Sequence, residues 1–546
     1  MYNEKLNEQL AKCFLDEKIP SQVKLKKMDY IIRLGADINA SVKENGFSIL
    51  TLAKIRGDND VIEWLEKNGA EIKLSNKDDA EKFFKSASVE EINQVLDVLP
   101  EGIELECDVD LSHRRLTELP DFSKVVVNGN FNCLDNYIEN LVGAPWKVSG
   151  DFRCNANRLK SLNGAPRVVG GLFNCAANEL KTLDEAPQNV GGFDCSYNQI
   201  ISLSGAPKSV KGDFVCNNNK LITLKGAPVI VGGNFECSYN NLIDLYGSPN
   251  EVGGDFECGN NKLITLNGGP KEVKGSFRCN NNELETLEGI PEKIGGGIDC
   301  NYNELRTLNW APREVRGNFC CSGNNLETLE GCPQIIDGDF DCTSNELITL
   351  RGGPVKVGEN FYCGKNNLTN LEGISVEVGK GFYANNNEII SLEGMSIDAL
   401  DGIDLSCNQL TDLRGAPLTL KGSLILDHNK LESLNGAPRV VGGTLDCSFN
   451  KLKVLKGAPD IVSGSFDCCG NELVSLEGVP REIGWNFNCS NNRLENLEGA
   501  PVKVGGDFKC LKNPLKSLKG KSEIIGGNFV HAEIIQNSMI IPQIKR

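Results

Sequence analysis

Residues 131–151 read FNCLDNYIENLVGAPWKVSGD, and residues 152–172 read FRCNANRLKSLNGAPRVVGGL. The two stretches carry Phe, Cys, Asn, Leu and a Gly-Ala-Pro triplet at matching places, so the chain repeats itself every 21 residues. The asparagine recurs nineteen times, from Asn136 to Asn513, and only Asn198 breaks the spacing by coming one residue early. A fixed period over this length predicts a stacked array of repeats instead of one globular core.

The spacing of apolar residues within the unit predicts a short strand. In the stretch Asp255-Phe256-Glu257-Cys258, side chains of a strand would alternate, so that Phe256 and Cys258 enter the core while Asp255 and Glu257 face outward. Stacked copies would lie ~4.8 Å apart, with equal residues in ladders. The asparagine of each copy can donate and accept hydrogen bonds at a bend, and the glycines and prolines suit tight return segments.

Written as a consensus, the unit V-x-G-x-F-x-C-x-x-N-x-L-x-x-L-x-G-A-P resembles the leucine-rich repeat. The resemblance covers about three quarters of the chain, and the repeat unit is similar to those of the short bacterial and viral repeat classes. It implies an α+β multidomain repeat protein, mainly a β solenoid with parallel strands on the concave face. We expect about 20 repeats over residues 101–546, an N-terminal cap layer near 107–120 in which Arg114 replaces the asparagine, and a C-terminal capping tail near 519–546.

The first 100 residues are different in kind. RLGADINA around Gly35 and KNGAEIKL around Gly69 are 34 residues apart, and the intervening sequence resembles the ankyrin repeat, with SILTLA at 48–53 where that family has T-P-L-H-x-A. Its usual Pro and His are missing. The resemblance implies a small all-α ankyrin-like domain over residues 1–100. A short array of this kind is marginal alone, so we expect it to pack on the first leucine-rich repeats.

Composition restricts the partners of the protein. A formal net charge of -17 disfavours nucleic acids and anionic membranes, which require clustered Lys and Arg, and favours basic proteins. Charges interrupt every short apolar run near the N-terminus, so we expect no secretory signal, and no stretch is long enough to span a membrane. These features predict a cytoplasmic protein, or one delivered into a host cell if it is an effector, and we expect a monomer.

Cysteine follows the repeat. Sixteen of the 22 cysteines, from Cys133 to Cys510, occupy the third apolar position. Thiolates can ligate metals or act as nucleophiles, but free cysteine is also a small buried hydrophobe. Ala384, Leu405 and Leu426 replace cysteine without breaking the repeat, and the C-x-x-C pairs typical of zinc sites are absent from the sequence. We therefore expect reduced, buried packing residues, with neither a metal nor a cofactor.

The sequence offers little for catalysis. Only His113, His428 and His531 could act as general bases of the histidine type, and although His428 follows Asp427, which could orient it, the position varies freely between copies. The repeated Gly-Gly pairs lack the Lys-Ser/Thr ending of a phosphate loop and recur with the structural period. We expect a protein that is not an enzyme.

The outward strand positions are the candidate binding surface, because they are free to vary in this fold. Residues just before and after each Phe position are thirteen acids against Arg153, Arg278 and Lys509, and tyrosines lie beside them as interface anchors. The alternative is that the acids serve only solubility. The predicted binding residues are Asp194, Tyr197, Asp213, Glu236, Tyr239, Asp255, Glu257, Asp299, Tyr302, Asp339, Asp341, Tyr362 and Tyr383.

Two classes of function remain open on these grounds. The first is a protein-interaction scaffold or effector that binds a basic partner on its acidic concave face, and the second is the substrate-recognition component of an enzyme complex such as a ubiquitin ligase. A carbohydrate- or calcium-binding surface is a weaker alternative. One stretch, residues 373–426, departs from the pattern because Ser375 and Ser396 replace the prolines, and it is either a docking site or a join between duplicated blocks.

Overall fold

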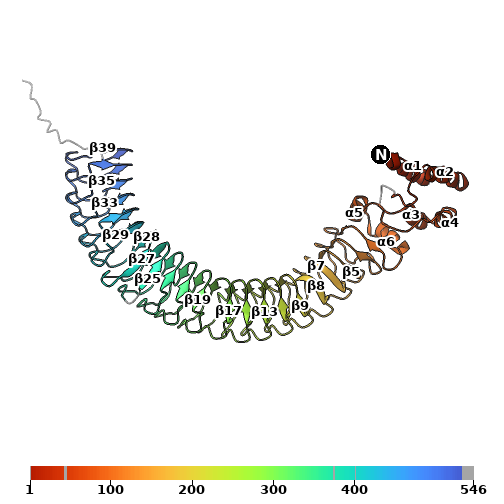
Figure 1. Ribbon diagram of the computed structural model, residues 1–546, viewed down its shortest axis with the longest axis horizontal. Coiled ribbons are helices and arrows are strands. Elements are labelled where there is room, and N and C mark those ends of the chain that lie inside the picture. The colour runs from red at the N-terminus through yellow and green to blue at the C-terminus, as the bar shows by residue number, and fades with distance from the viewer. Residues whose placement is uncertain (1, 42–45, 373–374, 400, 532–546) are drawn as a thin grey trace, which may run out of the picture. The chain divides into compact units, whose positions relative to one another are not determined.

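The computed structural model describes residues 2–41, 46–372, 375–399 and 401–531 (Figure 1). Within these ranges six helices are followed by a long series of short strands. The chain forms two compact units: unit 1 comprises Met1–Leu263 and Asn267–Lys274, and unit 2 comprises Ile264–Leu266 and Gly275–Arg546.

The helical region begins unit 1. Its helices are α1 (Tyr2–Leu15), α2 (Ser21–Arg33), α3 (Ile49–Arg56), α4 (Asn59–Lys67), α5 (Lys77–Ser86) and α6 (Val89–Val98). Leu10, Phe14, Met28 and Leu65 form its core. Ser48, the first residue of the ankyrin-like motif, directly precedes α3, and its hydroxyl donates a hydrogen bond to the carbonyl of Glu71 at 2.7 Å. The identification of this region with ankyrin repeats, and its boundary at residue 100, remain predictions.

The helical region packs on the first repeat, as expected. Phe84 of α5 contacts Phe122 with ring centroids 5.7 Å apart, and Phe122 contacts the first ladder phenylalanine, Phe131, at 5.2 Å. Arg114 occupies the place of the asparagine in this cap layer, and its guanidinium donates to the carbonyls of Phe84 and Ala87. The substitution of Asn by Arg therefore joins the cap layer to the end of α5.

Each repeat contributes a strand at the Phe position, here called a face strand. In unit 1 these are β2 (Val109–Asp110), β4 (Phe131–Asn132), β6 (Phe152–Arg153), β7 (Val168–Asn174), β8 (Asn189–Asp194), β10 (Phe214–Val215), β12 (Phe235–Glu236) and β14 (Phe256–Glu257). In unit 2 they are β16 (Phe277–Arg278), β18 (Ile298–Asp299), β20 (Phe319–Cys320), β22 (Phe340–Asp341), β24 (Phe361–Tyr362), β26 (Gly381–Tyr383), β28 (Gly402–Asp404), β30 (Ser423–Ile425), β32 (Leu445–Asp446), β34 (Phe466–Asp467), β36 (Phe487–Asn488), β38 (Phe508–Lys509) and β40 (Phe529–Val530).

A second strand lies at the Val position of most repeats. In unit 1 these strands are β1 (Glu104–Leu105), β3 (Val126–Val127), β5 (Lys147–Val148), β9 (Ser209–Val210), β11 (Ile230–Val231), β13 (Glu251–Val252) and β15 (Glu272–Val273), while β7 and β8 span both positions. In unit 2 they are β17 (Lys293–Ile294), β19 (Glu314–Val315), β21 (Ile335–Ile336), β23 (Lys356–Val357), β25 (Ser375–Val378), β27 (Ser396–Ala399), β29 (Thr419–Leu420), β31 (Val440–Val441), β33 (Ile461–Val462), β35 (Glu482–Ile483), β37 (Lys503–Val504) and β39 (Ile524–Ile525).

Equal residues of successive copies stack, because the strands pair in parallel with an offset of one repeat. Phe214 pairs with Phe235, and Phe235 with Phe256. The short copy before Asn198 is absorbed between β7 and β8, where Val168 pairs with Asn189 but Leu172 pairs with Gly192, one residue out of step. The predicted parallel-strand solenoid is confirmed. Residues 532–546 of the predicted C-terminal cap, and residues 373, 374 and 400 of the irregular stretch, lie outside the described residues.

The ladder asparagine connects two consecutive repeats. Asn240 donates through Nδ2 to the carbonyls of Cys216, Cys237 and Ser238 at 3.1–3.2 Å, and its Oδ1 accepts the backbone N–H of Leu221 at 2.9 Å. Its side chain is buried, so these bonds satisfy groups that water cannot reach. This geometry confirms the structural role predicted for the asparagine.

Candidate protein-binding surface

Outward side chains of the face strands form two rows, which together make the strand face. The post-Phe row contains the residue directly after each Phe position, and the pre-Phe row contains the residue directly before it. Strand register sets Glu236 beside Glu257 in unit 1 and Tyr362 between Asp341 and Tyr383 in unit 2. The predicted site residues in the post-Phe row are Asp194, Glu236, Glu257, Asp299, Asp341, Tyr362 and Tyr383, and those in the pre-Phe row are Asp213, Asp255 and Asp339.

Side chains of the pre-Phe row accept backbone hydrogen bonds from the next repeat. Asp213 Oδ1 accepts the N–H of Asn234 at 2.7 Å, and Asp339 Oδ1 accepts the N–H of Asn360 at 3.0 Å. Asn234 does the same through its amide oxygen, which accepts the N–H of Asp255 at 2.9 Å. The row therefore stabilises the stack, a role that the sequence analysis did not foresee.

Aspartates of the post-Phe row close a turn at the end of their own strand. Asp194 Oδ1 accepts the N–H and the hydroxyl of Ser196 at 3.0 and 2.7 Å, and Asp299 Oδ1 accepts the N–H of Asn301 at 3.0 Å. Asx turns of this kind need only a side-chain oxygen. Asn174 supplies one from its amide at 3.0 Å. These aspartates therefore act through an oxygen that a neutral amide can also supply, and the turn does not need their negative charge.

Glu236 and Glu257 differ from these aspartates. Their longer side chains stand in register on adjacent strands, and Glu236 Oε2 accepts a hydrogen bond from Asn217 Nδ2 at 2.8 Å. Burial, together with the neighbouring Glu257 carboxylate, raises the pKa of Glu236. Burial likewise raises the pKa of Asp299. Glu236 and Asp299 are thus held half-buried, where their charge is costly.

Three predicted tyrosines occupy the corner position, which is the residue immediately before the ladder asparagine. Tyr197, Tyr239 and Tyr302 have φ of 54°, 57° and 53°, and their side chains are 62%, 57% and 61% exposed. Other copies place Asn218 or Gly323 at this corner, with φ of 55° and 65°. Asparagine and glycine tolerate the left-handed region, whereas a bulky side chain there is strained. The tyrosines are therefore unfavourable choices for the fold itself.

Rings at the corner lie over the following repeat. A side-chain carbon at Gly323 would come within 2.7 Å of the Tyr302 ring, and one at Gly470 within 2.7 Å of the Phe449 ring. The glycine thus leaves room for the aromatic ring of the preceding copy. Exposed aromatic rings fixed in this way present apolar area with little remaining freedom, which suits an interface.

The remaining two tyrosines stack within the post-Phe row. The rings of Tyr362 and Tyr383 lie 4.8 Å apart at an interplanar angle of 14°. Register places Asp341 on one side of this pair and Asp404 on the other. Unit 2 therefore carries a short aromatic segment flanked by acids on its strand face.

The cysteine ladder lies on the opposite side of the face strands, in the core. All sixteen ladder cysteines are buried, and none of the 22 cysteines, which all fall in described ranges, forms a disulfide. Several thiols donate to a carbonyl of the next repeat, as Cys216 does to Glu236 at 3.2 Å. Burial raises the pKa of these thiols, as at Cys510 to about 11, so they stay protonated. This environment fits the predicted packing role.

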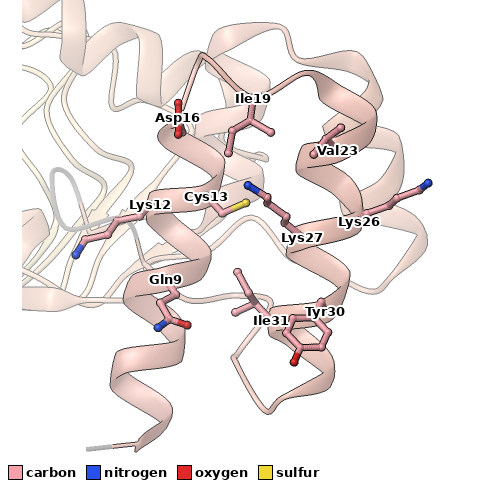
Figure 2. A pocket seen from close by; sticks show the side chains of 10 residues that line it. All are labelled: Gln9, Lys12, Cys13, Asp16, Ile19, Val23, Lys26, Lys27, Tyr30 and Ile31. Atoms are coloured by element: carbon pink, nitrogen blue, oxygen red, sulfur yellow. The ribbon is translucent and has the colours of Figure 1, made fainter.

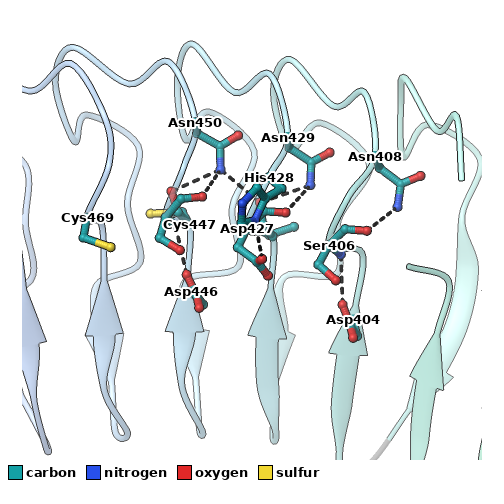
Figure 3. Close-up of polar contacts among 12 residues, drawn as sticks. Asp404, Ser406, Asn408, Asp427, His428, Asn429, Asp446, Cys447, Asn450 and Cys469 are labelled. Atoms are coloured by element: carbon teal, nitrogen blue, oxygen red, sulfur yellow. Dashed lines mark hydrogen bonds and ion pairs between the residues drawn. The ribbon is translucent and has the colours of Figure 1, made fainter. Parts of the chain in front are cut away.

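His428 is the one histidine for which the sequence suggested an orienting partner. Its Nδ1 lies 2.8 Å from Asp427 Oδ2 (Figure 3). Its ring stacks on that of Phe449, with ring centroids 4.7 Å apart. Cys407 occupies the same corner position in the preceding copy and is exposed. Burial, and then the Asp427 and Asp404 carboxylates, raise the pKa of Cys407. A nucleophilic cysteine needs the opposite shift.

Comparison with solved structures connects this architecture to known proteins. YopM from Yersinia enterocolitica WA-314 is similar with a TM-score of 0.55 and 22% identity, over 78% of this chain and 91% of that one. A cysteine-ladder-containing functional domain of InlJ from Listeria monocytogenes is similar with a TM-score of 0.29 and 15% identity, over 62% of this chain and 68% of that one. Neither a protein-family model nor a curated protein matches the sequence. The fold is therefore that of a leucine-rich-repeat protein.

Two further features of the described residues bear on other kinds of site. None of the helices there has the length and apolar character needed to cross a membrane. Across the same ranges, no group of three or more His, Cys, Asp or Glu side chains is arranged to hold a metal ion.

Proposed function

We propose that this chain is a non-catalytic binding protein that holds a basic protein partner against its strand face and the neighbouring corner tyrosines. The observation that carries the proposal is the placement of exposed tyrosines at left-handed corners, where asparagine or glycine would serve the fold better. A side chain that costs stability and buries little of itself is best explained by contact with another molecule.

The acids of the post-Phe row support a basic partner. Asparagine would close the same turn, as at Asn174, so the carboxylates of Asp194, Asp299 and Asp341 supply charge that the fold does not need. Glu236 and Glu257 stand in register, and like charges on adjacent strands repel each other. Lysine and arginine side chains of a partner would relieve that repulsion and steer association at low salt.

The buried, protonated thiols support a reducing compartment, either the cytoplasm or a host cell that receives the protein. Delivery into a host would agree with the predicted effector role. The helical region joins the first layer of the solenoid through Phe84 and Arg114.

The test separates charge from fold. A partner is first recovered by affinity capture and identified. Its affinity is then measured by calorimetry for the double variant Asp299→Asn with Asp341→Asn, in which both sites keep a turn-closing oxygen. We expect binding to weaken about tenfold at low salt and the salt dependence to decrease. The matched control is Glu314→Gln with Glu330→Gln, which removes the same charge from exposed positions off the strand face. Equal effects of both pairs would refute a role for the strand face.

The variant Tyr302→Asn provides a second test of the proposed function. Asparagine suits the left-handed corner, so we expect the variant to gain about 1 kcal/mol of stability while losing affinity. A loss of affinity accompanied by a loss of stability would indicate a structural role for the tyrosine instead.

A further inference from the structure

A groove lies between the first two helices of the helical region, far along the chain from the strand face. It has a volume of about 540 Å³ and is lined by Gln9 and Cys13 of α1, by Asp16 directly after that helix, and by Val23 and Ile31 of α2 (Figure 2). This volume falls within the usual range for a specific binding site, which is roughly 300–1,000 Å³.

The groove is held open by contacts on its inner side. Lys24 of α2 is buried, and its Nζ donates to the carbonyl of Phe14 at 3.0 Å at the end of α1. Met28 of α2 and Leu10 of α1 are fully buried on the same inner side. The two helices are therefore fixed relative to each other before any ligand binds, which lowers the entropy cost of binding.

Apolar residues on the outer side of α2 follow helical spacing. Val23 and Tyr30 line the groove, lie seven residues apart and are 46% and 65% exposed. On α1, Gln9 and Cys13 are four residues apart and also line the groove. Two helices that present such rows side by side offer a seat for the apolar stripe of a third helix.

The charge of the groove is opposite to that of the protein. Lys12 lies on the flank of α1, Lys26 on the far flank of α2, and Lys27 extends toward Cys13 across the groove (Figure 2). Within the described residues none of the three lysines forms a salt bridge, and all are exposed. Residues 12–33 carry six Lys or Arg against three Asp or Glu, whereas the whole chain has a net charge of -17.

We propose that this groove is a second docking site, which binds an acidic amphipathic helix of a protein partner. The apolar stripe of that helix packs on Val23, Ile31 and Tyr30, and acids on its two flanks pair with Lys12 and Lys26. This site is independent of the proposed strand-face function, because it takes a partner of opposite charge. The protein would then join a basic partner and an acidic one at separate places.

The experiment uses the full chain and a designed probe. The probe is a fluorescein-labelled 16-residue helical peptide with leucine at helical i, i+3/i+4, i+7 spacing and glutamate on both flanks, and its binding is followed by fluorescence anisotropy. A version with every glutamate replaced by glutamine is the charge control, because a lysine version would bind the acidic strand face. We expect the unaltered protein to bind the acidic peptide at least about tenfold more tightly than the glutamine version at low salt.

Substitutions then locate the site. Lys26→Glu with Lys27→Glu should weaken binding of the acidic peptide about tenfold or more, and Val23→Ser with Tyr30→Ser should weaken it at every salt concentration. Lys67→Glu with Lys82→Glu reverses two exposed charges of α4 and α5 away from the groove and should leave binding unchanged. Circular dichroism checks that each variant keeps its helices.

Three results would overturn the proposal. One is equal affinity for the acidic and glutamine peptides, and another is equal weakening by the groove pair and the control pair. The third is a concentration-dependent dimer, seen by light scattering, that Lys26→Glu with Lys27→Glu disperses, because the occupant would then be a second copy of the chain. Loss of strand-face binding in Asp299→Asn with Asp341→Asn leaves this peptide assay unaffected, so the two proposals fail separately.

Discussion

Residues 214–257 and residues 375–426 build the same repeat from different side chains. The first region places Cys237 under its face strand and a proline in each return segment, whereas the second has Leu405 at the cysteine position and Ser375 at the proline position. Strands of the second row have two residues in the first region, as in β11, but four in β25 and β27. Proline lacks an N–H and fixes φ, so its removal lets the strand extend back to the serine.

The asparagine ladder is the same in both regions. Asn408 donates to the carbonyls of Ala384, Leu405 and Ser406 at 3.0–3.1 Å, as Asn240 does to its three carbonyls. Its partners are backbone groups, which do not depend on the side chains around them. The comparison teaches that the repeat tolerates any apolar core residue of suitable size but requires one specific amide.

Thiol reactivity should show the largest difference between the two regions. Cys407 is exposed, whereas Cys237 is fully buried and burial raises its pKa. A ladder thiol reacts only after local opening, so iodoacetamide should modify Cys407 about 10³-fold faster. Timed labelling with peptide mass spectrometry measures both rates. Rapid modification of Cys237 in native protein, or its recovery in a disulfide, would contradict the buried, reduced ladder.

Removal of the ladder amide should reduce the free energy of unfolding by the same amount in both regions. Asn240→Ala and Asn408→Ala each delete bonds to three carbonyls and leave buried groups unsatisfied, so we expect a loss of about 2–4 kcal/mol in either case. Urea unfolding followed by circular dichroism gives the change. Asn250→Ala, at an exposed position, is the control and should have little effect. A much smaller loss at Asn408 would show that the longer strands compensate for the amide.

Exchange of the core residues between the two regions should cost less stability than removal of the ladder amide. Cys237→Leu adds volume to a closely packed layer and should destabilise by about 1–3 kcal/mol. Leu405→Cys leaves a cavity and should cost about 2 kcal/mol. If Cys237→Leu were neutral in urea unfolding, the regular repeats would have room that the structure does not show.

The smallest effect concerns the half-buried acids. Glu236 has a raised pKa, so the folded protein binds its proton more readily than the unfolded chain, and the resulting stabilisation at low pH is lost as pH rises through the folded pKa. Glu236→Gln should therefore raise stability by about 0.5 kcal/mol at pH 7.5 and by less toward pH 4. Thermal unfolding at the two pH values measures the change, with Glu314→Gln as the control. A larger gain in stability at pH 4 than at pH 7.5 would show that folding lowers the pKa of Glu236 instead of raising it.

The site was only partly predictable from its residues. Alternation along the strand correctly placed Glu236 and Asp341 outward, and the acidic character of the face was visible in the composition of two positions. The hydrogen bonds that Asp213 and Asp194 accept from backbone groups could not be predicted, because they depend on where the next repeat or the following turn places an N–H. One available signal was the alternation of Asp with Asn at these positions, which indicates an oxygen acceptor.

The basic groove between α1 and α2 was not predicted from the sequence. Its lysines and apolar residues are ordinary in a helical sequence, and only the packing of α1 against α2 brings Lys12 and Lys26 to the two sides of one groove.

By itself, the sequence determined the solenoid, the position of every ladder and the burial of the ladder cysteines, because a 21-residue period makes each copy the environment of the next. Local alternation then decides which side chains face inward. Tertiary structure alone decided which acids are bound to backbone groups, that the corner tyrosines have left-handed backbone angles, and that two helices flank an open, basic groove. These features depend on distances between segments and on backbone angles, and neither quantity is carried by the order of residues along a strand.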